Sequence, residues 1–158
     1  MRLWRVIAAE FKRTPMSTRG AFLTPGRWHS AGSEVLYCAE TESLAKTERF
    51  VHLAQETGLD FVLLELSVPE TAAIERAENL PISMKHWDDP ASAQGRAVGD
   101  WWLAHTSALG LSVPSVLSTS ERDVMLRRDS PDFSSVKVAH QTSFRYDPRM
   151  FKQQVDGK

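Results

Sequence analysis

The chain has 158 residues, of which 42% are apolar and 25% charged, and this length and balance fit one globular domain. Its 19 lysines and arginines against 20 aspartates and glutamates give a formal net charge of -1, which excludes the strong basic field of a protein that binds nucleic acid through its charge. The single cysteine, Cys38, excludes an internal disulfide and is typical of a reducing compartment. Neither a signal peptide nor an apolar run long enough to span a bilayer is present, so we expect a cytoplasmic protein without membrane contact.

The first third of the chain predicts two short strands and a helix. Residues 3–7 indicate a strand, and the stretch 13–26, which contains proline and glycine, predicts a loop. Residues 35–39, VLYCA, predict a second strand that is apolar on both faces and therefore belongs inside a sheet. A helix is expected next, with Thr41 as its N-cap and Gly58 just after its last turn.

Glu48 lies at the edge of the apolar side of this expected helix. It follows Leu44 by one turn and precedes Val51 by about one turn, both of which we expect to be buried. Its carboxylate is therefore expected at the margin of the core and not in open solvent. Two interpretations remain open, a flanking carboxylate paired with a cation and a functional group.

The rest of the chain predicts more strands than helices. Residues 61–68, which are apolar on both faces, predict an interior strand, and Asp89-Pro90 predicts the start of a helix that reaches Ala108. Pro114 favours an edge or strand-start position for its strand. Because strands and helices do not alternate regularly, we expect a single α+β domain with a mixed β-sheet core and flanking helices. Shorter strands are expected at 74–77, 113–117 and 136–140.

Three familiar kinds of site are missing from the sequence. The five histidines lack the spacing of metal ligands, so we expect no metal and interpret them as scattered surface residues. Cys38 lies within an apolar strand, where a cysteine usually fills space, although a catalytic cysteine stays an alternative. The glycine-rich phosphate loops of NTPases and dinucleotide-binding folds are absent, so a nucleotide would have to be bound in another way.

Residues 26–40, GRWHSAGSEVLYCAE, concentrate groups that can bind a nucleotide. The guanidinium of Arg27 can bind a phosphate through two hydrogen bonds, and Trp28 or Tyr37 can offer an aromatic surface to a ring. The same residues also fit a surface arginine beside a core tryptophan. Ser115 also has two interpretations, a strand hydroxyl bonded to the backbone and a functional group. The spacing of these residues alone therefore does not decide which reaction the site catalyses.

Several short motifs follow one another along the chain, and each is weak by itself. Their order resembles that of the RES domain family, which takes its name from Arg, Glu and Ser. The resemblance runs from residue 3 to residue 151, so we expect a RES domain over residues 1–151 and a flexible tail over residues 152–158. The matching stretches are LWRV (3–6), GRWHSAG (26–32), VLYCAE (35–40), SLA (43–45) leading to Glu48, VPS (113–115), SPDF (130–133) and DPRMF (147–151).

Members of this family are toxins of bacterial toxin-antitoxin pairs, consume NAD+, and have a fold that resembles ADP-ribosyltransferases. The resemblance implies that Arg27, Glu48 and Ser115 are catalytic. It also implies a cognate Xre-type DNA-binding antitoxin that covers the site, while the toxin itself does not bind nucleic acid. A homodimer within the toxin-antitoxin complex is compatible with the family. The residues implied to contact NAD+ are Gly26, Arg27, Trp28, Tyr37 and Ser115.

Two segments depart from the family pattern. Pro25-Gly26 stands where the family usually has Gly-Gly, and proline should stiffen this turn. Residues 122–129, RDVMLRRD, stand where many members have an Asn-rich segment ending in Asn-Pro. Any substrate contact made from this second segment is therefore left open.

The resemblance leads to one hypothesis with two alternatives. The hypothesis is a toxin that cleaves the nicotinamide–ribose bond of NAD+ with water or phosphate as acceptor, which depletes NAD+ and arrests growth. The first alternative is a mono-ADP-ribosyltransferase that modifies a host-cell protein. The second is an interaction module, not an enzyme, that binds a partner through exposed Trp28 and Tyr37. A ribonuclease is disfavoured because the chain is not basic and shows no His/carboxylate pair.

Overall fold

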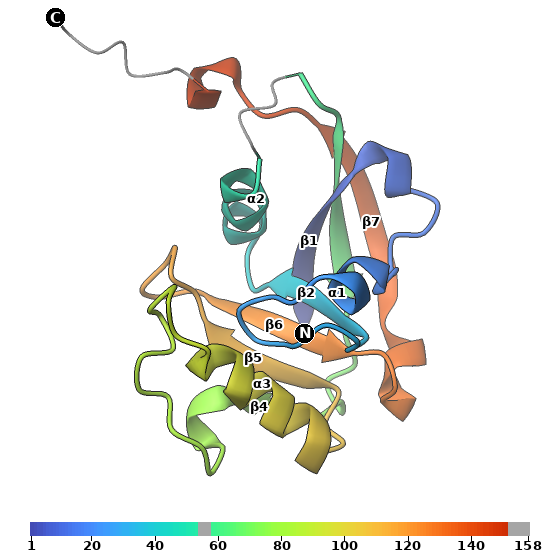
Figure 1. Ribbon diagram of the computed structural model, residues 1–158. Helices are drawn as coiled ribbons and strands as arrows, with labels where there is room; N and C mark the ends of the chain where they lie inside the picture. The colour runs from blue at the N-terminus through green and yellow to red at the C-terminus, as the bar shows by residue number, and fades with distance from the viewer. Residues whose placement is uncertain (54–57, 152–158) are drawn as a thin grey trace, which may run out of the picture.

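The structure is a computed structural model that describes residues 1–53 and 58–151. Seven strands form one mixed sheet in the order β4-β5-β6-β2-β1-β3-β7 (Figure 1). Of the strand pairs described, β4 and β5 run parallel and the others run antiparallel, which confirms the α+β class. The strands are β1 Arg2–Ala8, β2 Val35–Ala39, β3 Phe61–Ser67, β4 Ile74–Arg76, β5 Gly110–Pro114, β6 Arg122–Arg127 and β7 Lys137–Phe144, and the helices are α1 Arg19–Leu23, α2 Glu42–Val51 and α3 Gln94–His105.

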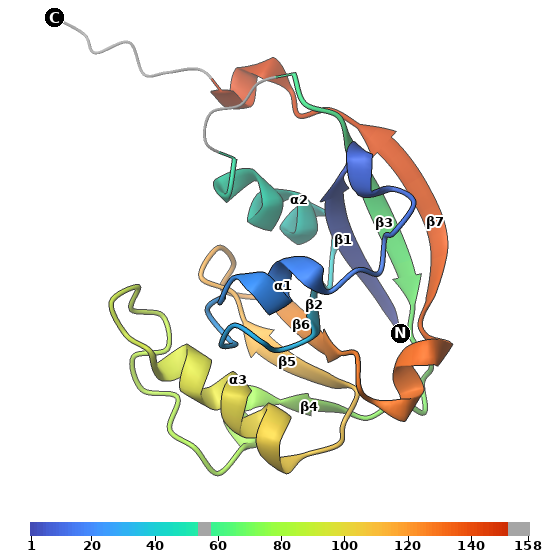
Figure 2. The same cartoon turned by 45° about the vertical axis from the view of Figure 1, so that its right-hand side comes forward.

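The sheet divides into two halves between β1 and β2. β1 pairs with β3 along its whole length, whereas its register with β2 contains a single pair, Trp4 opposite Ala39. Figure 2 shows the two halves turning away from each other, with α2 beside β1 and α3 beside β4 and β5. We call β1, β3, β7 and α2 the α2 half, and β2, β4, β5, β6 and α3 the α3 half.

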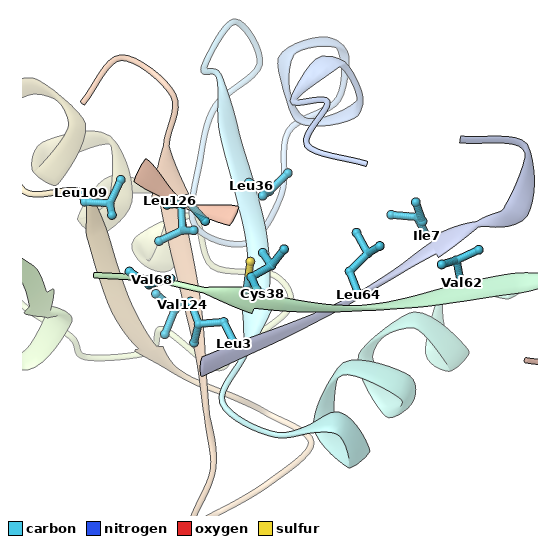
Figure 3. Packing of buried hydrophobic residues seen from close by; sticks show 12 residues of the cluster. Leu3, Ile7, Leu36, Cys38, Val62, Leu64, Val68, Leu109, Val124 and Leu126 are labelled. Atoms are coloured by element: carbon cyan, nitrogen blue, oxygen red, sulfur yellow. The ribbon is translucent and has the colours of Figure 1, made fainter. Parts of the chain in front are cut away.

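A shared hydrophobic core joins the two halves, and each helix adds a smaller cluster of its own. The shared core draws side chains from both halves, including Leu3, Leu64 and Leu126 (Figure 3). α2 packs through Leu44 and Ala45 against the sheet. The cluster under α3 consists of Trp28, Val35, Ala77, Val98, Trp102, Leu111, Val113 and Met125.

The start of α2 is confirmed and its end is not where the sequence predicts it. The Thr41 hydroxyl accepts a hydrogen bond from the Leu44 N–H at 3.1 Å, as an N-cap does. The helix ends at Val51, which is 53% exposed and therefore not part of the buried side. The remainder of the expected helix includes residues 54–57, which lie outside the described residues.

α3 is shorter than predicted because local signals gave the wrong start. Asp89 does not cap a helix; its carboxylate accepts from the Ala91 N–H in a turn, and α3 begins at Gln94. The helix ends at His105 and does not reach Ala108. No helix in the described part of the chain is long and apolar enough to cross a membrane.

Three strand and loop predictions need correction. The expected loop 13–26 contains the short helix α1, and residues 122–127 form β6, which the sequence did not predict. Pro114 neither starts a strand nor lies on an edge strand, since it ends β5, which lies between β4 and β6. Because β4 pairs with β5 only as far as Ser112, Pro114 lies beyond β4 and its missing N–H costs no bond on that side.

Candidate active site

Tyr37 and His29 fix the turn that carries Arg27. His29 is buried, and its Nε2 lies 2.9 Å from the Ala21 carbonyl and 3.1 Å from that of Thr24. Two carbonyl partners require a proton on Nε2, so in the neutral ring Nδ1 is the acceptor. The Tyr37 hydroxyl donates to this Nδ1 at 2.7 Å and accepts from the Trp28 N–H at 3.3 Å. The interpretation of every histidine as a surface residue is therefore wrong for His29.

Gly26 is required by this arrangement. A Cβ at position 26 would lie 2.9 Å from the Tyr37 hydroxyl and 2.9 Å from the His29 ring, closer than side chains tolerate. The Gly26 N–H also donates to the His29 carbonyl at 3.1 Å, which closes the turn. Burial raises the pKa of Tyr37, so its hydroxyl keeps its proton and remains committed to the turn. The part of Tyr37 left for a ligand is its ring.

α3 holds the backbone of Arg27 and Trp28 through two glycines. A Cβ on Gly99 would lie 1.6 Å from the Trp28 carbonyl oxygen, and one on Gly95 would lie 3.0 Å from that of Arg27. Only glycine allows the helix to approach the turn this closely at position 99. Gly95 and Gly99 are therefore the means by which α3 positions the arginine.

The side chains of Arg27 and Trp28 differ in exposure. Trp28 is 3% exposed and stacks on Trp87 with ring centroids 5.5 Å apart. The exposed Trp28 that an interaction module needs is therefore not present, and this part of that alternative is wrong. Arg27 is half-buried, and its Nη1 donates to the Trp87 carbonyl at 3.1 Å. Its guanidinium keeps further N–H groups for a ligand.

Glu48 and Ser115 meet although 67 positions separate them in the chain. The Ser115 hydroxyl donates to Glu48 Oε1 at 2.6 Å and accepts from the Leu117 N–H at 3.0 Å. Ser115 is buried. Glu48 is half-buried, as the position of Glu48 on its helix predicts. The serine thus orients one carboxylate oxygen of α2 from the end of β5.

Asp123 of β6 adds a second carboxyl to this pair. Its register places it opposite Ala39 of β2 and Val113 of β5, the strand that leads into Ser115. Burial, followed by the nearby negative charge of Glu48, raises the pKa of Asp123 to about 8. Its segment departs from the family pattern and carries no strand signal, so the sequence gave no reason to expect a carboxyl here.

Arg5 is a further group near the site that sequence reasoning missed. It lies in β1 and donates from Nη1 to the Tyr37 carbonyl at 2.8 Å. Its Nε has no partner among the described residues, and burial lowers its pKa. The available signal was a charged residue inside the otherwise apolar run LWRVI.

The structure therefore assembles two groups of the expected residues. Gly26, Trp28 and Tyr37 are in contact with one another, and Glu48 is bonded to Ser115. No hydrogen bond between described residues joins Arg27 to Glu48 or Ser115. Cys38 is buried as expected, and burial raises its pKa to about 12, which disfavours a thiolate nucleophile. Within residues 1–53 and 58–151, no cluster of three potential metal ligands is present.

Fold and site together define a single-domain α+β protein in which an arginine turn and a serine-bound glutamate are placed on one mixed sheet. The sequence profile of the RES domain family matches residues 2–147, and the chain belongs to this family. A Sphingobium sp. protein named Prs ADP-ribosylating toxin is 31% identical over 157 residues, which cover 94% of this chain and 96% of the relative. Proteins named Toxin Res from Photorhabdus laumondii and Yersinia enterocolitica are 31% and 29% identical, with 96% and 95% of this chain covered and 98% and 99% of the relatives.

A solved structure supports the fold. The crystal structure of the M. tuberculosis MbcT-MbcA toxin-antitoxin complex contains a chain that matches with a TM-score of 0.69 and 18% sequence identity. The match covers 95% of this chain and 86% of that chain. The single α+β domain expected from the order of strands and helices is thus confirmed as the fold.

Proposed function

We propose that this chain, with its domain over residues 1–151, is the toxin of a bacterial toxin-antitoxin pair and that it cleaves the nicotinamide–ribose bond of cytoplasmic NAD+. The observation that carries this proposal is the half-buried Glu48 carboxylate held by the Ser115 hydroxyl at 2.6 Å. Family membership and the names of the toxin relatives support the biological role. The chemistry is argued below from the site residues.

The reaction demands a negative charge beside the ribose more than it demands an acid. As the bond to nicotinamide breaks, its electron pair moves to the ring nitrogen, and nicotinamide leaves as a neutral molecule. Positive charge then develops on the ribose, as it does in glycoside hydrolysis. A fixed carboxylate in a partly buried site stabilises this charge far better than one in open water.

The site residues can supply these needs in distinct ways. Glu48 stabilises the developing charge and orients the ribose hydroxyls or the acceptor, and Ser115 keeps the carboxylate in place. Arg27 binds the pyrophosphate with guanidinium N–H groups that Trp87 does not occupy. The Tyr37 ring packs against the nicotinamide end, because its hydroxyl is engaged by His29 and Trp28. Gly26 and the buried Trp28 contribute by shaping the turn.

The acceptor decides between two activities that share this first step. Transfer to water or phosphate makes the chain an NAD+ glycohydrolase or phosphorylase that depletes NAD+. Transfer to a side chain of a host protein makes it a mono-ADP-ribosyltransferase. The name of the Sphingobium relative, Prs ADP-ribosylating toxin, favours keeping this second activity as a candidate.

We further propose a cognate antitoxin of the Xre type as the partner that blocks the site. The support is the toxin-antitoxin complex in which the solved structure of the same fold was determined. Co-expression with the product of an adjacent Xre-type gene tests this part. Growth should recover and NAD+ cleavage by the purified complex should fall.

The cleavage proposal is tested by releasing nicotinamide from NAD+ with purified protein. Glu48→Gln keeps the side chain's size and removes its charge, so the rate should fall by at least about a hundredfold, equivalent to about 2.7 kcal/mol. Glu42→Gln is the matched control, because Glu42 lies on the same helix and is paired with Lys46 at its exposed start. The control should cleave NAD+ at close to the normal rate.

Product analysis separates the two candidate activities. Free ADP-ribose or its phosphate ester, formed in proportion to nicotinamide, supports depletion. Label from NAD+ on one protein band of a lysate, without bulk loss of NAD+, supports transfer to protein. A folded Glu48→Gln variant that cleaves NAD+ normally would overturn the proposed mechanism.

A further inference from the structure

We propose that Arg96 of α3 is a second binding residue for the pyrophosphate of NAD+, beside Arg27, and that the two arginines together make the site selective for the dinucleotide. The inference rests on the proposed NAD+ cleavage and adds a determinant of its substrate. Each phosphate of the pyrophosphate carries one negative charge, and Arg27 by itself balances only one of them. A second guanidinium at the same turn balances the other.

Arg96 lies against the turn that carries Arg27. Its Nε donates to the Gly26 carbonyl oxygen at 3.4 Å, and this carbonyl belongs to the peptide bond that joins Gly26 to Arg27. Gly95, the preceding residue of α3, approaches Arg27 itself. A Cβ on Gly95 would lie 3.0 Å from the Arg27 carbonyl oxygen and 3.3 Å from the Arg27 Cγ. The helix therefore brings Arg96 within one peptide unit of Arg27, although 70 positions separate Arg96 from Gly26.

Arg27 and Arg96 are both half-buried cations without a carboxylate partner in the described part of the chain. Their side-chain hydrogen bonds there go to carbonyl oxygens, from Arg27 to Trp87 and from Arg96 to Gly26. By contrast, a carboxylate binds Arg122 of β6 through two hydrogen bonds. Two neighbouring positive charges repel each other in a partly buried site, so an anion that bridges them is favoured.

The acid one turn along α3 from Arg96 is committed elsewhere. Asp100 follows Arg96 by four positions, a spacing at which side chains of a helix can pair. The two carboxylate oxygens of Asp100 instead accept from the N–H and the hydroxyl of Ser30. Within residues 1–53 and 58–151, only the Nε of Arg96 has a hydrogen-bond partner. Its Nη groups therefore remain for a phosphate, which a guanidinium can bind through two parallel hydrogen bonds.

The two arginines act on a part of the substrate that does not react. Nicotinamide riboside contains the same nicotinamide–ribose bond as NAD+ and has no phosphate, so neither arginine gives it binding energy. The site then selects NAD+ through contacts made away from the bond that breaks.

The experiment measures kcat/KM for NAD+ and for nicotinamide riboside. Arg96→Gln removes the charge, so kcat/KM for NAD+ should fall at least about tenfold, mainly through a higher KM, while the value for nicotinamide riboside should stay within about twofold of wild type. Arg96→Lys keeps the charge without the planar fork and should lose about threefold on NAD+. Arg2→Gln is the matched control, because exposed Arg2 lies on β1 and pairs with Glu65, and it should match wild type on both substrates.

The comparison of substrates separates binding from a structural role. Equal losses on both substrates in folded Arg96→Gln and Arg96→Lys would overturn the proposal, because Arg96 would then act only by holding the Gly26 carbonyl in place. An unchanged KM for NAD+ in Arg96→Gln would overturn it as well.

A second readout needs no cleavage. ADP-ribose keeps the pyrophosphate and lacks nicotinamide, so its Kd, measured by calorimetry, should rise at least about tenfold in Arg96→Gln. Protein that shows this rise but releases no nicotinamide from NAD+ keeps the second arginine and refutes the proposed function. Protein that cleaves NAD+ and binds ADP-ribose equally well with and without the Arg96 charge refutes the second arginine. Protein that neither cleaves NAD+ nor binds ADP-ribose refutes both.

Discussion

The two halves of the sheet place their functional groups by different means. In the α3 half, the backbone of α3 touches the Arg27–Trp28 turn through Gly99, so the turn has no room to move. In the α2 half, the helix rests on the sheet through Leu44 and Ala45, and the Ser115 hydroxyl of the other half holds Glu48 by a hydrogen bond. The ligand-binding turn is thus built into the fold, whereas the carboxylate is held across the division between the halves.

The largest expected effect is on the helix contact of the α3 half. Gly99→Ala puts a Cβ 1.6 Å from the Trp28 carbonyl, and relieving this clash should cost about 3 kcal/mol of unfolding free energy, measured in urea. Gly20→Ala in α1 is the control, because its Cβ would meet nothing within 4 Å. If the two variants unfold at the same urea concentration, the close contact does not exist in solution.

A smaller effect is expected from removing the hydroxyl that fixes the turn. Tyr37→Phe leaves the buried His29 Nδ1 and the Trp28 N–H without their partner, which should cost about 2 kcal/mol. Tyr146 lies after β7 and donates its hydroxyl to the Lys46 carbonyl of α2 at 2.7 Å, so Tyr146→Phe removes one bond to the α2 half and about 1 kcal/mol should be lost. Equal losses in the two variants would remove the distinction between the halves.

The smallest effect is expected at the start of α2. Thr41→Ala removes the N-cap bond to Leu44 and should cost about 1 kcal/mol by thermal unfolding. Because Glu48 lies further along the helix and is also bonded to Ser115, NAD+ cleavage at low temperature should change little. Thr41→Ser, which keeps the cap oxygen, should restore most of the stability. A large loss of cleavage with intact stability would show that the cap positions the carboxylate.

Local features of the sequence predicted the elements whose signals are local. The apolar runs of β1, β2 and β3 and the Thr41 cap are patterns within a few residues, and the structure confirms them. The half-buried position of Glu48 also follows from helical spacing alone. The predicted start of α3 was wrong because Asp89-Pro90 resembles an N-cap locally. The observed helix begins at Gln94, where it packs against the Arg27–Trp28 turn.

Contacts between distant segments could not be predicted from spacing. The bond between Ser115 and Glu48 spans 67 positions. The strand β6, which carries Asp123, begins and ends with charged residues and was therefore not predicted. The burial of His29 depends on carbonyls of the segment 21–24, which the sequence marks only as a loop. The family resemblance named Arg27, Glu48 and Ser115 as a hypothesis. The fold is what shows that Ser115 bonds Glu48 and that Arg27 bonds the Trp87 carbonyl.

The two outer strands of the sheet have a consequence for how the chain behaves at high concentration. β4 is three residues long, and β7 carries exposed polar side chains that include Lys137, His140 and Gln141. A short strand and a polar, charged strand are poor templates for pairing with another chain. Pairing of these edge strands with a strand of another molecule is therefore disfavoured, and so is the growth of fibres through the edges of the sheet.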